Sequence, residues 1–205
     1  MQKYIMIGTG GHANSIFDLV KNNGHEVKSV VGFTEGKQYF ENIPVIKLED
    51  LKNFSSEYKL LLGIGNFEIR NRVLEEIYLL KMDFKFPSVI HSSAYISKTT
   101  SVGSGTVIFA NAYVGPNSSI GNFCVLNTNV SIEHDSLIGD QNFLAPSTTL
   151  AGNVATGEKC FFGMGSLISN NISIGSNSVI AANSFVDRNI PENSFAAGSP
   201  AELKK

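Results

Sequence analysis

One histidine of this chain lies directly between two carboxylates, in the stretch SIEHDSLIGD at residues 131–140. Glu133 and Asp135 flank His134, while lysine and arginine are almost absent from residues 99–187, where only Lys159 occurs. A carboxylate beside an imidazole can fix one tautomer and raise its basicity, which is what a general base requires. A base of this kind alone can remove the proton of an amine or hydroxyl as it attacks a thioester. A solvated turn is the alternative reading.

A six-residue period positions this cluster. From Ile96 to Val186 every sixth residue is large and apolar except Thr156, most of them have a small or β-branched residue two positions earlier, and glycine often follows. Neither the helical period nor simple alternation produces this pattern. It is typical of a parallel β-helix in which three hexapeptides form one coil and glycine relieves the corners, and we predict about five coils. Ile132 is one of the apolar positions, so Glu133, His134 and Asp135 should face outward without a part in the repeat.

The first 85 residues follow a different pattern. Apolar segments at 3–8, 26–33, 43–51 and 59–65 alternate with amphipathic runs at 12–23 and 66–80. Strands that alternate with helices favour a parallel sheet. The chain is therefore expected to contain a small α/β, Rossmann-like substrate-binding domain at 1–85 and a β-helix domain with a C-terminal tail at 86–205.

A glycine-rich turn follows the first predicted strand. Residues 8–13, Gly-Thr-Gly-Gly-His-Ala, fit the dinucleotide fingerprint, whose backbone N–H groups and helix N-terminus bind an anion. A dinucleotide site also needs a carboxylate at the end of the second strand, but Gly32-Phe33 stand there and Glu35 is the nearest acid. We therefore favour a phosphate-bearing substrate over NAD(P); a turn that only packs helix on strand is the third possibility. A second turn, GIGN at 63–66, should lie at the same sheet edge and strengthens the binding interpretation.

Composition excludes several other classes of protein. The net charge of −2 offers no basic field for nucleic acid or anionic lipid. The N-terminus has no signal-peptide pattern and no apolar run is long enough to span a membrane, so we expect a cytoplasmic protein. Cys124 and Cys160 stand far apart, without metal-ligand spacing, at small inward positions of the repeat. We expect both to be core residues, and no metal site.

Five stretches of the chain together resemble the left-handed β-helix sugar acyltransferases, which include bacterial sialic acid O-acetyltransferases and UDP-4-amino-sugar N-acetyltransferases. They are IGTGGHA, GIGNFEIR, VIHSSAYIS, LNTNVSIEHDSLIGD and the closing AAGSPAELK, and with the hexapeptide array they cover essentially the whole chain. IEHD in its context is the most specific of these motifs. The resemblance implies that the β-helix is left-handed.

The resemblance also implies a homotrimer with acetyl-CoA in the groove between neighbouring subunits. Residue by residue, His134 corresponds to the general base and Asp135 to the acid that orients it. Four residues correspond to positions that hold the nucleotide or sugar phosphate, namely Gly10, Gly11, His12 and Gly65. Positions that line the acyl-CoA groove correspond to Gly152, Met164 and Ala182.

Two positions depart from the family pattern. Gly32-Phe33 replace an acidic pair that nucleotide-amino-sugar members usually carry, which puts recognition of a uridine nucleotide in doubt. Phe143 stands where some members have a second histidine near the thioester carbonyl, so a hydrogen bond to the acyl group would have to come from Asn142 or a backbone N–H.

The predicted activity is acyl-CoA-dependent N-acylation of a nucleotide-linked amino sugar for a bacterial surface glycan, with acetyl-CoA as the expected donor. O-acetylation of a sialic-acid-like sugar is the first alternative. A non-catalytic, trimeric sugar-binding scaffold is the alternative from another class: Phe143 favours it, and the retained IEHD motif argues against it. A nicotinamide-dependent role is more distant.

Overall fold

A computed structural model describes residues 1–33, 38–81 and 83–204, and the chain divides into two compact units, Met1–Val89 and Ile90–Lys205. Glu35 lies outside the described residues. We had placed the domain boundary after residue 85. The structure assigns residues 86–89 to the first unit, where Lys85 forms a parallel bridge with Lys59.

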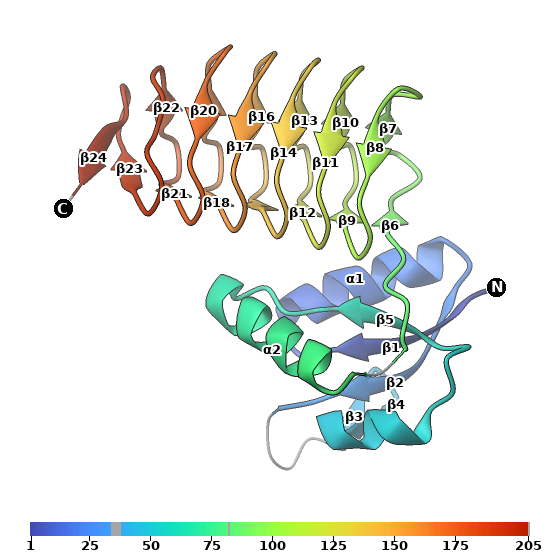
Figure 1. Ribbon diagram of the computed structural model, residues 1–205. Coiled ribbons are helices and arrows are strands. Elements are labelled where there is room, and N and C mark those ends of the chain that lie inside the picture. Colours follow the sequence, from blue (N-terminus) through green and yellow to red (C-terminus); the bar gives the residue numbers. More distant parts are fainter. Residues whose placement is uncertain (34–37, 82, 205) are drawn as a thin grey trace. The chain divides into compact units, whose positions relative to one another are not determined.

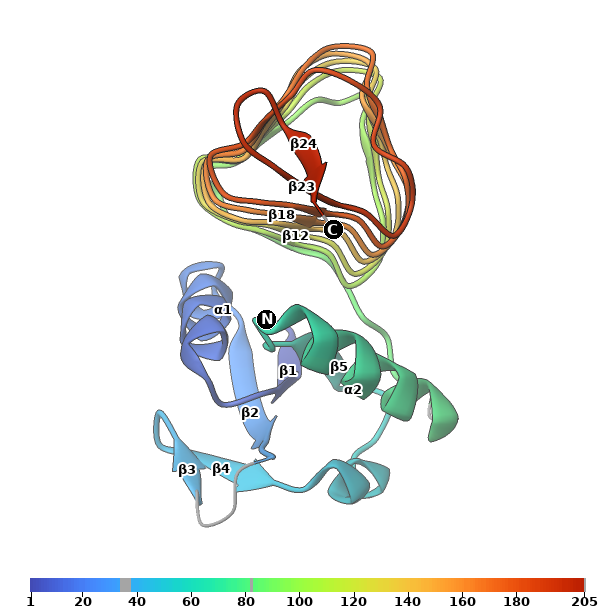
Figure 2. The ribbon, with the colours of Figure 1, turned by 90° about the vertical axis from the view of Figure 1, so that its left-hand side faces the viewer.

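The first unit is built on a five-stranded sheet with the strand order β3-β4-β2-β1-β5 (Figure 1). All neighbouring pairs are parallel except the β3–β4 hairpin, so the predicted Rossmann-like sheet is confirmed. A short 3₁₀ helix, η1, lies on the side of the sheet away from α1 (Figure 2). The elements are β1 (Lys3–Ile7), α1 (Gly11–Asn22), β2 (Glu26–Val31), β3 (Tyr39–Phe40), β4 (Ile43–Ile46), η1 (Leu48–Asn53), β5 (Lys59–Leu62) and α2 (Phe67–Leu79).

Burial explains most of these elements. The β1 residues from Tyr4 to Ile7 are at most 1% exposed, as expected for a strand between two parallel neighbours with helices over its faces. Helix α1 buries Ala13, Ile16, Leu19 and Val20, which recur at helical spacing, and packs on β1 and β2. The predicted strand at 43–51 is correct only in its first half. From Leu48 the chain turns into η1, because Asp50 accepts a hydrogen bond from the Lys47 amide (2.9 Å).

The second unit is a parallel β-helix whose coils are triangular in cross-section (Figure 2). The predicted left-handed hexapeptide fold and its coil number are confirmed, since each face stacks five or more short strands in register. Sheet 1 contains β7 (Tyr95–Ile96), β10 (Tyr113–Val114), β13 (Ser131–Ile132), β16 (Thr149–Leu150), β19 (Leu167–Ile168) and β22 (Phe185–Val186). Sheet 2 contains β8 (Ser101–Val102), β11 (Ser119–Ile120), β14 (Leu137–Ile138), β17 (Ala155–Thr156) and β20 (Ser173–Ile174). Sheet 3 contains β6 (Val89–Ile90), β9 (Val107–Ile108), β12 (Val125–Leu126), β15 (Phe143–Leu144), β18 (Phe161–Phe162), β21 (Val179–Ile180), β23 (Phe195–Ala197) and the antiparallel β24 (Glu202–Lys204).

The second residue of each repeat strand points inward, as the six-residue period predicted. These side chains form one continuous core with the small residues beside them. Cys124 and Cys160 form no disulfide and are fully buried, which confirms their assignment to the core. Thr156 is the one polar residue among the large inward-pointing positions of the repeat. Its hydroxyl accepts a hydrogen bond from Nδ2 of Asn142 (2.7 Å), so these two buried polar side chains bond to each other.

The corners of the coils need two backbone features, and we predicted only one of them. Glycine after a strand permits close approach of coils: a Cβ on Gly139 would lie 2.5 Å from the carbonyl oxygen of Gly157. The left-handed residue of a corner stands two positions later and is most often asparagine, as at Asn117 (φ 59°) and Asn153 (φ 58°). Asparagine adopts this conformation more readily than most residues. Our assignment of glycine to corner strain was therefore incomplete.

No helix in the described part of the chain is long and apolar enough to cross a membrane.

Candidate active site

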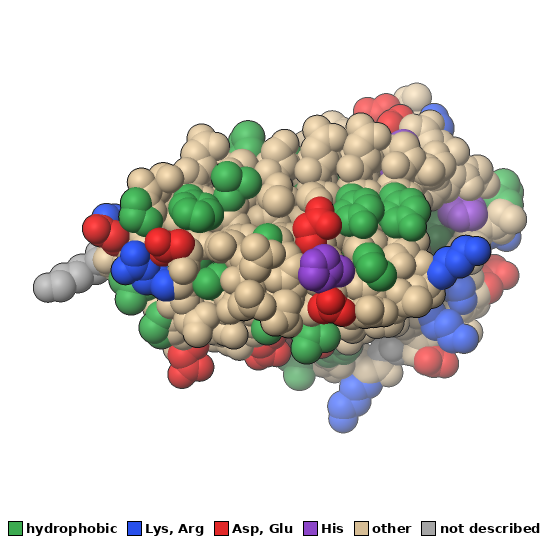
Figure 3. Space-filling view, turned by 90° about the horizontal axis from the view of Figure 1, so that it is seen from above, with side chains coloured by type: hydrophobic (Ala, Val, Ile, Leu, Met, Phe, Trp, Pro, Cys, Tyr) green, Lys and Arg blue, Asp and Glu red, His purple; other side chains and the backbone are tan. Residues whose placement is uncertain are grey.

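His134 lies at the corner where the chain passes from sheet 1 to sheet 2, which we name the 1–2 corner. Its successive turns are residues 97–100, 115–118, 133–136, 151–154 and 169–172. Figure 3 shows a largely uncharged face of the β-helix on which a histidine lies between acidic side chains. The side chains of His134 and Asp135 are 58% and 51% exposed, so both are accessible to a ligand.

The carboxylate of Asp135 orients the imidazole of His134. Asp135 Oδ2 lies 2.7 Å from His134 Nδ1, and Asp135 Oδ1 accepts a hydrogen bond from Nδ2 of Asn117 at 3.2 Å. Hydrogen bonds from His134 and then Asn117 lower the pKa of Asp135 below its ordinary value. Because an ionised carboxylate only accepts hydrogen bonds, Nδ1 carries the proton and the lone pair of the neutral ring is on Nε2. Glu133 instead accepts a hydrogen bond from Ser131 (3.1 Å).

Asp135 also has a structural role that we did not predict. Its φ of 58° makes it the left-handed residue of its turn, the position that Asn117 and Asn153 occupy in neighbouring coils. Aspartate and asparagine both tolerate this conformation. Asp135 is therefore a corner residue whose side chain is also placed against the imidazole.

Gly152 provides the surface on which the imidazole rests. It is the residue one coil beyond His134 at the same corner, and a Cβ built there would lie 2.6 Å from both Cε1 and Nε2 of His134. Its amide N–H donates to Oδ1 of Asn170 (3.0 Å). A larger residue at 152 would occupy the space of the ring edge that carries the lone pair.

The other residues predicted for the acyl-CoA groove lie elsewhere on the β-helix. Met164 (59% exposed) and Ala182 stand in consecutive turns of the corner between sheets 3 and 1, where the Asn183 amide donates to the Met164 carbonyl (2.9 Å). Phe143, 8% exposed, stacks on Phe161 of sheet 3 with ring centroids 5.6 Å apart. Within one chain, the structure therefore brings only Gly152 of this set to His134.

Asn142 is a correction. We predicted that its amide could contact the acyl group, but it is fully buried at a small inward position of the repeat. Its Nδ2 donates to Thr156 and to the carbonyls of Gly139 and Gly157, and its Oδ1 accepts from the Cys160 amide. An amide that is engaged in this way holds coils together and cannot reach a ligand.

The first unit contains a pocket of about 320 Å³ that joins the two glycine turns. The turns are in direct contact, since a Cβ on Gly65 would lie 2.9 Å from Cβ of His12. A Cβ on Gly10 or Gly11 would meet no atom within 4 Å, so packing inside the protein does not require glycine at either position. All four residues predicted to bind phosphate, Gly10, Gly11, His12 and Gly65, line this pocket.

The pocket is electrostatically suited to an anion. Helix α1 starts at Gly11, and helix α2 starts after Asn66, whose side chain accepts a hydrogen bond from the Ile69 amide (2.9 Å). The N-termini of both helices therefore meet at one pocket. Burial, and then the positive charge of Arg70, lower the pKa of His12 to about 4. His12 is thus a neutral group at neutral pH.

The lowered pKa of His12 makes the stability of the protein depend on pH. A histidine in the unfolded chain titrates near 6.5, so between that pH and about 4 the unfolded state binds a proton that the folded state does not. The free energy of unfolding should therefore fall by about 2 kcal/mol from pH 7 to pH 5. In the His12→Gln variant this component should be absent. Urea titrations of wild type and His12→Gln at pH 7 and pH 5 measure the free energy of unfolding. The same pH dependence in both proteins would contradict this prediction.

The end of β2 carries an aromatic residue in place of an acid. Phe33, 50% exposed, lines the pocket with Ile69, which is 42% exposed. A Cβ on Gly32 would lie 2.5 Å from Cγ1 of Val45, so packing against β4 excludes any side chain at residue 32. The described residues that line the pocket thus include no carboxylate to bind ribose hydroxyls, as a nicotinamide dinucleotide would require.

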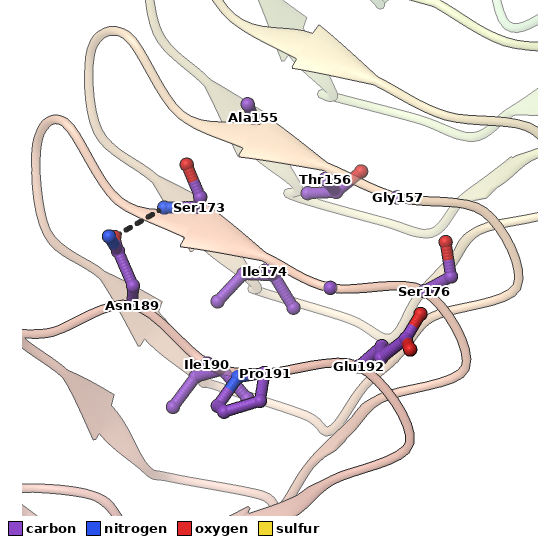
Figure 4. A pocket seen from close by; sticks show the side chains of 11 residues that line it. Ala155, Thr156, Gly157, Ser173, Ile174, Ser176, Asn189, Ile190, Pro191 and Glu192 are labelled. Carbon is purple, nitrogen blue, oxygen red and sulfur yellow. Dashed lines mark hydrogen bonds between the residues drawn. The ribbon is translucent and has the colours of Figure 1, made fainter.

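A larger, open hollow of about 570 Å³ lies at the end of sheet 2 (Figure 4). It arises where the next strand is replaced by residues 189–191, and Oδ1 of Asn189 accepts a hydrogen bond from the Ser173 amide (2.8 Å). Glu192 is the charged residue that lines it, and none of the predicted site residues does. The described residues also contain no group of three or more histidine, cysteine or acidic side chains arranged to hold a metal ion.

Sequence reasoning missed two residues of these sites. Asn117 was overlooked although it precedes Asp135 by one full coil, a spacing that places two residues side by side at a corner. The sequence identified Phe33 only as the replacement of an acidic residue, whereas in the structure its side chain lines the pocket of the first unit.

Comparisons with known proteins agree with this architecture. Residues 3–77 match the PglD N-terminal domain, and residues 154–188 match the hexapeptide repeat of succinyl-transferase. UDP-N-acetylbacillosamine N-acetyltransferase of Bacillus subtilis (strain 168) is 34% identical over 113 residues, 52% of this chain. The match spans about half (51%) of the length of that relative.

Two solved structures match nearly the whole chain. One is a histidine-to-asparagine variant of perosamine N-acetyltransferase from Caulobacter crescentus in complex with CoA and GDP-perosamine. It has a TM-score of 0.92 and 26% identity, over 100% of this chain and 98% of that one. The other is the acetyltransferase domain of PglB from Neisseria gonorrhoeae FA1090 in complex with acetyl coenzyme A, with a TM-score of 0.89 and 28% identity over 99% of each chain. The resemblance drawn from the sequence motifs is thereby confirmed.

Proposed function

We propose that this chain, which resembles the left-handed β-helix sugar acyltransferases, transfers an acetyl group from acetyl-CoA to the amino group of a nucleotide-linked amino sugar. The observation that carries the proposal is the exposed His134–Asp135 pair, in which the hydrogen bond at Nδ1 leaves the lone pair of the imidazole on Nε2, at the ring edge beside Gly152. N-acylation is favoured over O-acylation because UDP-N-acetylbacillosamine N-acetyltransferase and perosamine N-acetyltransferase, to which this chain is similar, both acylate a nitrogen.

His134 acts as the general base of this reaction. Its Nε2 accepts a proton from the acceptor amine as the nitrogen attacks the thioester carbonyl. Asp135 stabilises the imidazolium that forms, through the hydrogen bond to Nδ1. When the tetrahedral intermediate collapses, the carbon–sulfur bond breaks and the proton on Nε2 is available to the departing thiolate. Each turnover thus forms one amide and one free thiol.

The pocket of the first unit holds the nucleotide of the acceptor. The N–H groups of the two glycine turns and the two helix N-termini bind its phosphates. Phe33 and Ile69 offer apolar surface on which the nucleobase can pack. Such packing needs no hydrogen bond to a particular edge of the nucleobase. These features support a nucleoside diphosphate sugar without selecting a uridine nucleotide.

The active form is a homotrimer in which a second copy completes the acyl-CoA groove. Gly152 lies beside His134, whereas Met164 and Ala182 lie at a different corner of the same coils. When copies stand side by side, the 1–2 corner of one copy and the corner between sheets 3 and 1 of the next can line the same groove, where one extended ligand touches both. The protein acts on soluble substrates of surface-glycan synthesis in the cytoplasm.

Gly11 provides a test of the phosphate site in which stability and binding should diverge. The Gly11→Ala variant adds a methyl group to the first residue of α1, where it meets no protein atom, so the melting temperature should be unchanged or higher. The methyl group would nevertheless occupy space at the backbone N–H groups, and the Kd for UDP or GDP should rise about tenfold or more. Calorimetric titration measures it, with Ser15→Ala on the exposed side of the same helix as the control. An unchanged Kd would remove the phosphate site from Gly11.

The proposed activity is tested by the release of free thiol from acetyl-CoA, followed with a chromogenic disulfide. The acceptors are UDP- and GDP-linked 4-amino sugars, the matching sugars with a hydroxyl at that position, and a sialic acid. We expect turnover only with the amino sugars. Turnover with the sialic acid alone would indicate O-acetylation. No turnover, together with no thermal stabilisation by excess acetyl-CoA, would favour a sugar-binding scaffold.

A further inference from the structure

Beside the His134–Asp135 pair, Asn117 makes a contact that the mechanism above does not use. Asn117 Nδ2 donates to Asp135 Oδ1 at 3.2 Å from the preceding coil, while Asp135 Oδ2 faces His134 Nδ1 at 2.7 Å. The two oxygens of one carboxylate therefore join the imidazole to an amide one coil away. Neither the proposed activity nor the related proteins assigns a role to this residue.

We propose that Asn117 is a positioning residue that fixes the carboxylate of Asp135, and through it the imidazole of the general base. The proposal rests on the proposed function and names one more residue of the same site. Asp135 is about half exposed, so without a second partner its carboxylate is free to rotate away from the line of the Nδ1–H bond. The amide of Asn117 closes that rotation from the side opposite the imidazole.

Asn117 is itself held in place by the coil before it. Its backbone N–H donates to Oγ1 of Thr99 (2.9 Å), and its φ of 59° is the left-handed value of the corner. Thr99, Asn117 and Asp135 occupy the same position of three consecutive coils. The orientation of the imidazole thus depends on contacts between residues one coil, or 18 residues, apart, and the bond from Asn117 to Asp135 is the contact nearest the ring.

The same corner contains a matched contact without a histidine. Asn153 Nδ2 donates to Asn171 Oδ1 at 2.8 Å, in the same direction along the β-helix as the bond from Asn117 to Asp135. Asn117 and Asn171 have nearly equal φ values, 59° and 61°. Breaking either contact should cost the fold a similar amount, so any additional effect at Asn117 reports on the base.

The charges that face the imidazole are few. Glu133 and Asp135 are on its own turn, and the turns directly before and after it, 115–118 and 151–154, contain no titratable side chain. Lys98 lies on the turn 97–100, two coils before His134. A charge introduced at residue 117 would therefore act on Asp135 and His134 with little competition.

The experiment compares Asn117→Gly with Asn171→Gly, since glycine accepts the left-handed conformation at both positions. We expect kcat for acetyl transfer to fall about tenfold in Asn117→Gly, with KM for both substrates changed less than about twofold. Asn171→Gly should leave both constants within about twofold of the wild type. Equal, small effects in both variants would show that Asn117 only holds coils together and would overturn the proposal.

A second variant gives a readout that needs no activity. Asn117→Asp keeps the shape and the backbone preference of asparagine but replaces the donor with a second carboxylate. An added negative charge favours the positively charged, protonated imidazole, so the NMR titration midpoint of the His134 ring should move up by about 0.5–1 pH unit in the ligand-free protein. Asn171→Asp should leave it unchanged.

The two readouts separate the two proposals. A shifted His134 titration without any acetyl transfer would leave the positioning role intact and refute the proposed function. An unshifted titration in Asn117→Asp would refute the positioning role whatever the activity.

Discussion

The His134→Ala variant should lose a factor of roughly 10²–10⁴ in kcat for acetyl transfer, because it removes the group that accepts the amine proton at the moment of attack. The side chain is 58% exposed at a corner, so its removal leaves no cavity in the core and the melting temperature should change little. KM for acetyl-CoA and for the acceptor should stay close to the wild-type values, since the pocket of the first unit is untouched.

The measurement is the steady-state rate of thiol release by wild type and variant at saturating substrates, after size-exclusion chromatography has shown the same oligomer for both. Glu133→Ala is the control, because Glu133 is on the same turn but its carboxylate is held by Ser131. Its kcat should remain within a few-fold of wild type. A His134→Ala variant that is folded and retains near-normal kcat would refute the assigned base.

The Gly152→Ala variant should lower kcat by about 10²-fold although residue 152 carries no reactive group. The added Cβ would lie 2.6 Å from Nε2 of His134, and the exposed ring is the part that can move. Backbone contacts of the corner, including the bond from the Gly152 amide to Asn170, can remain. The variant should therefore fold normally with its base displaced.

A double-mutant cycle separates displacement of the base from any other effect of the methyl group. In a His134→Ala background the ring is absent, so adding Gly152→Ala should have almost no further effect on kcat. If the two substitutions instead multiplied their separate effects, residue 152 would act independently of His134. That result would contradict the packing of the ring on Gly152 as the cause.

The β-helix was predictable from sequence because its strand, corner and core positions repeat every six residues without an insertion. The two exceptions were harder. Thr156 looked like a lapse in the aliphatic column and Asn142 like a polar group available to a ligand, whereas they form a buried hydrogen-bonded pair. The register alone placed Asn142 at an inward position, so attention to the repeat would have prevented the error.

The candidate active-site corner could be located from the sequence, but its geometry could be predicted only in part. The motif IEHD identified His134 and Asp135, but the contact with Asn117 and the packing on Gly152 join residues one coil apart. Such contacts depend on which side chains stack along a corner. They become visible in sequence only when residues are compared at the spacing of a whole coil.

The first unit shows the limit set by local packing. The absence of an acid after β2 was evident in the sequence, but the lack of space for a side chain at Gly32, where a Cβ would lie 2.5 Å from Cγ1 of Val45, was not. Nor could the pattern reveal that the half-exposed Phe33 lines the same pocket as both glycine turns. These facts follow from which strands are neighbours, and that is a property of the folded sheet.

The most direct test of the proposed activity is the identity of the product formed from acetyl-CoA and a nucleotide-linked 4-amino sugar. Mass spectrometry and NMR of the purified product should find one acetyl group, attached through an amide to the sugar nitrogen, with one free thiol released per product. The His134→Ala protein should yield the same product far more slowly. If the wild-type protein, shown to bind both substrates, forms no such amide, the assignment of this chain as a sugar N-acetyltransferase is wrong.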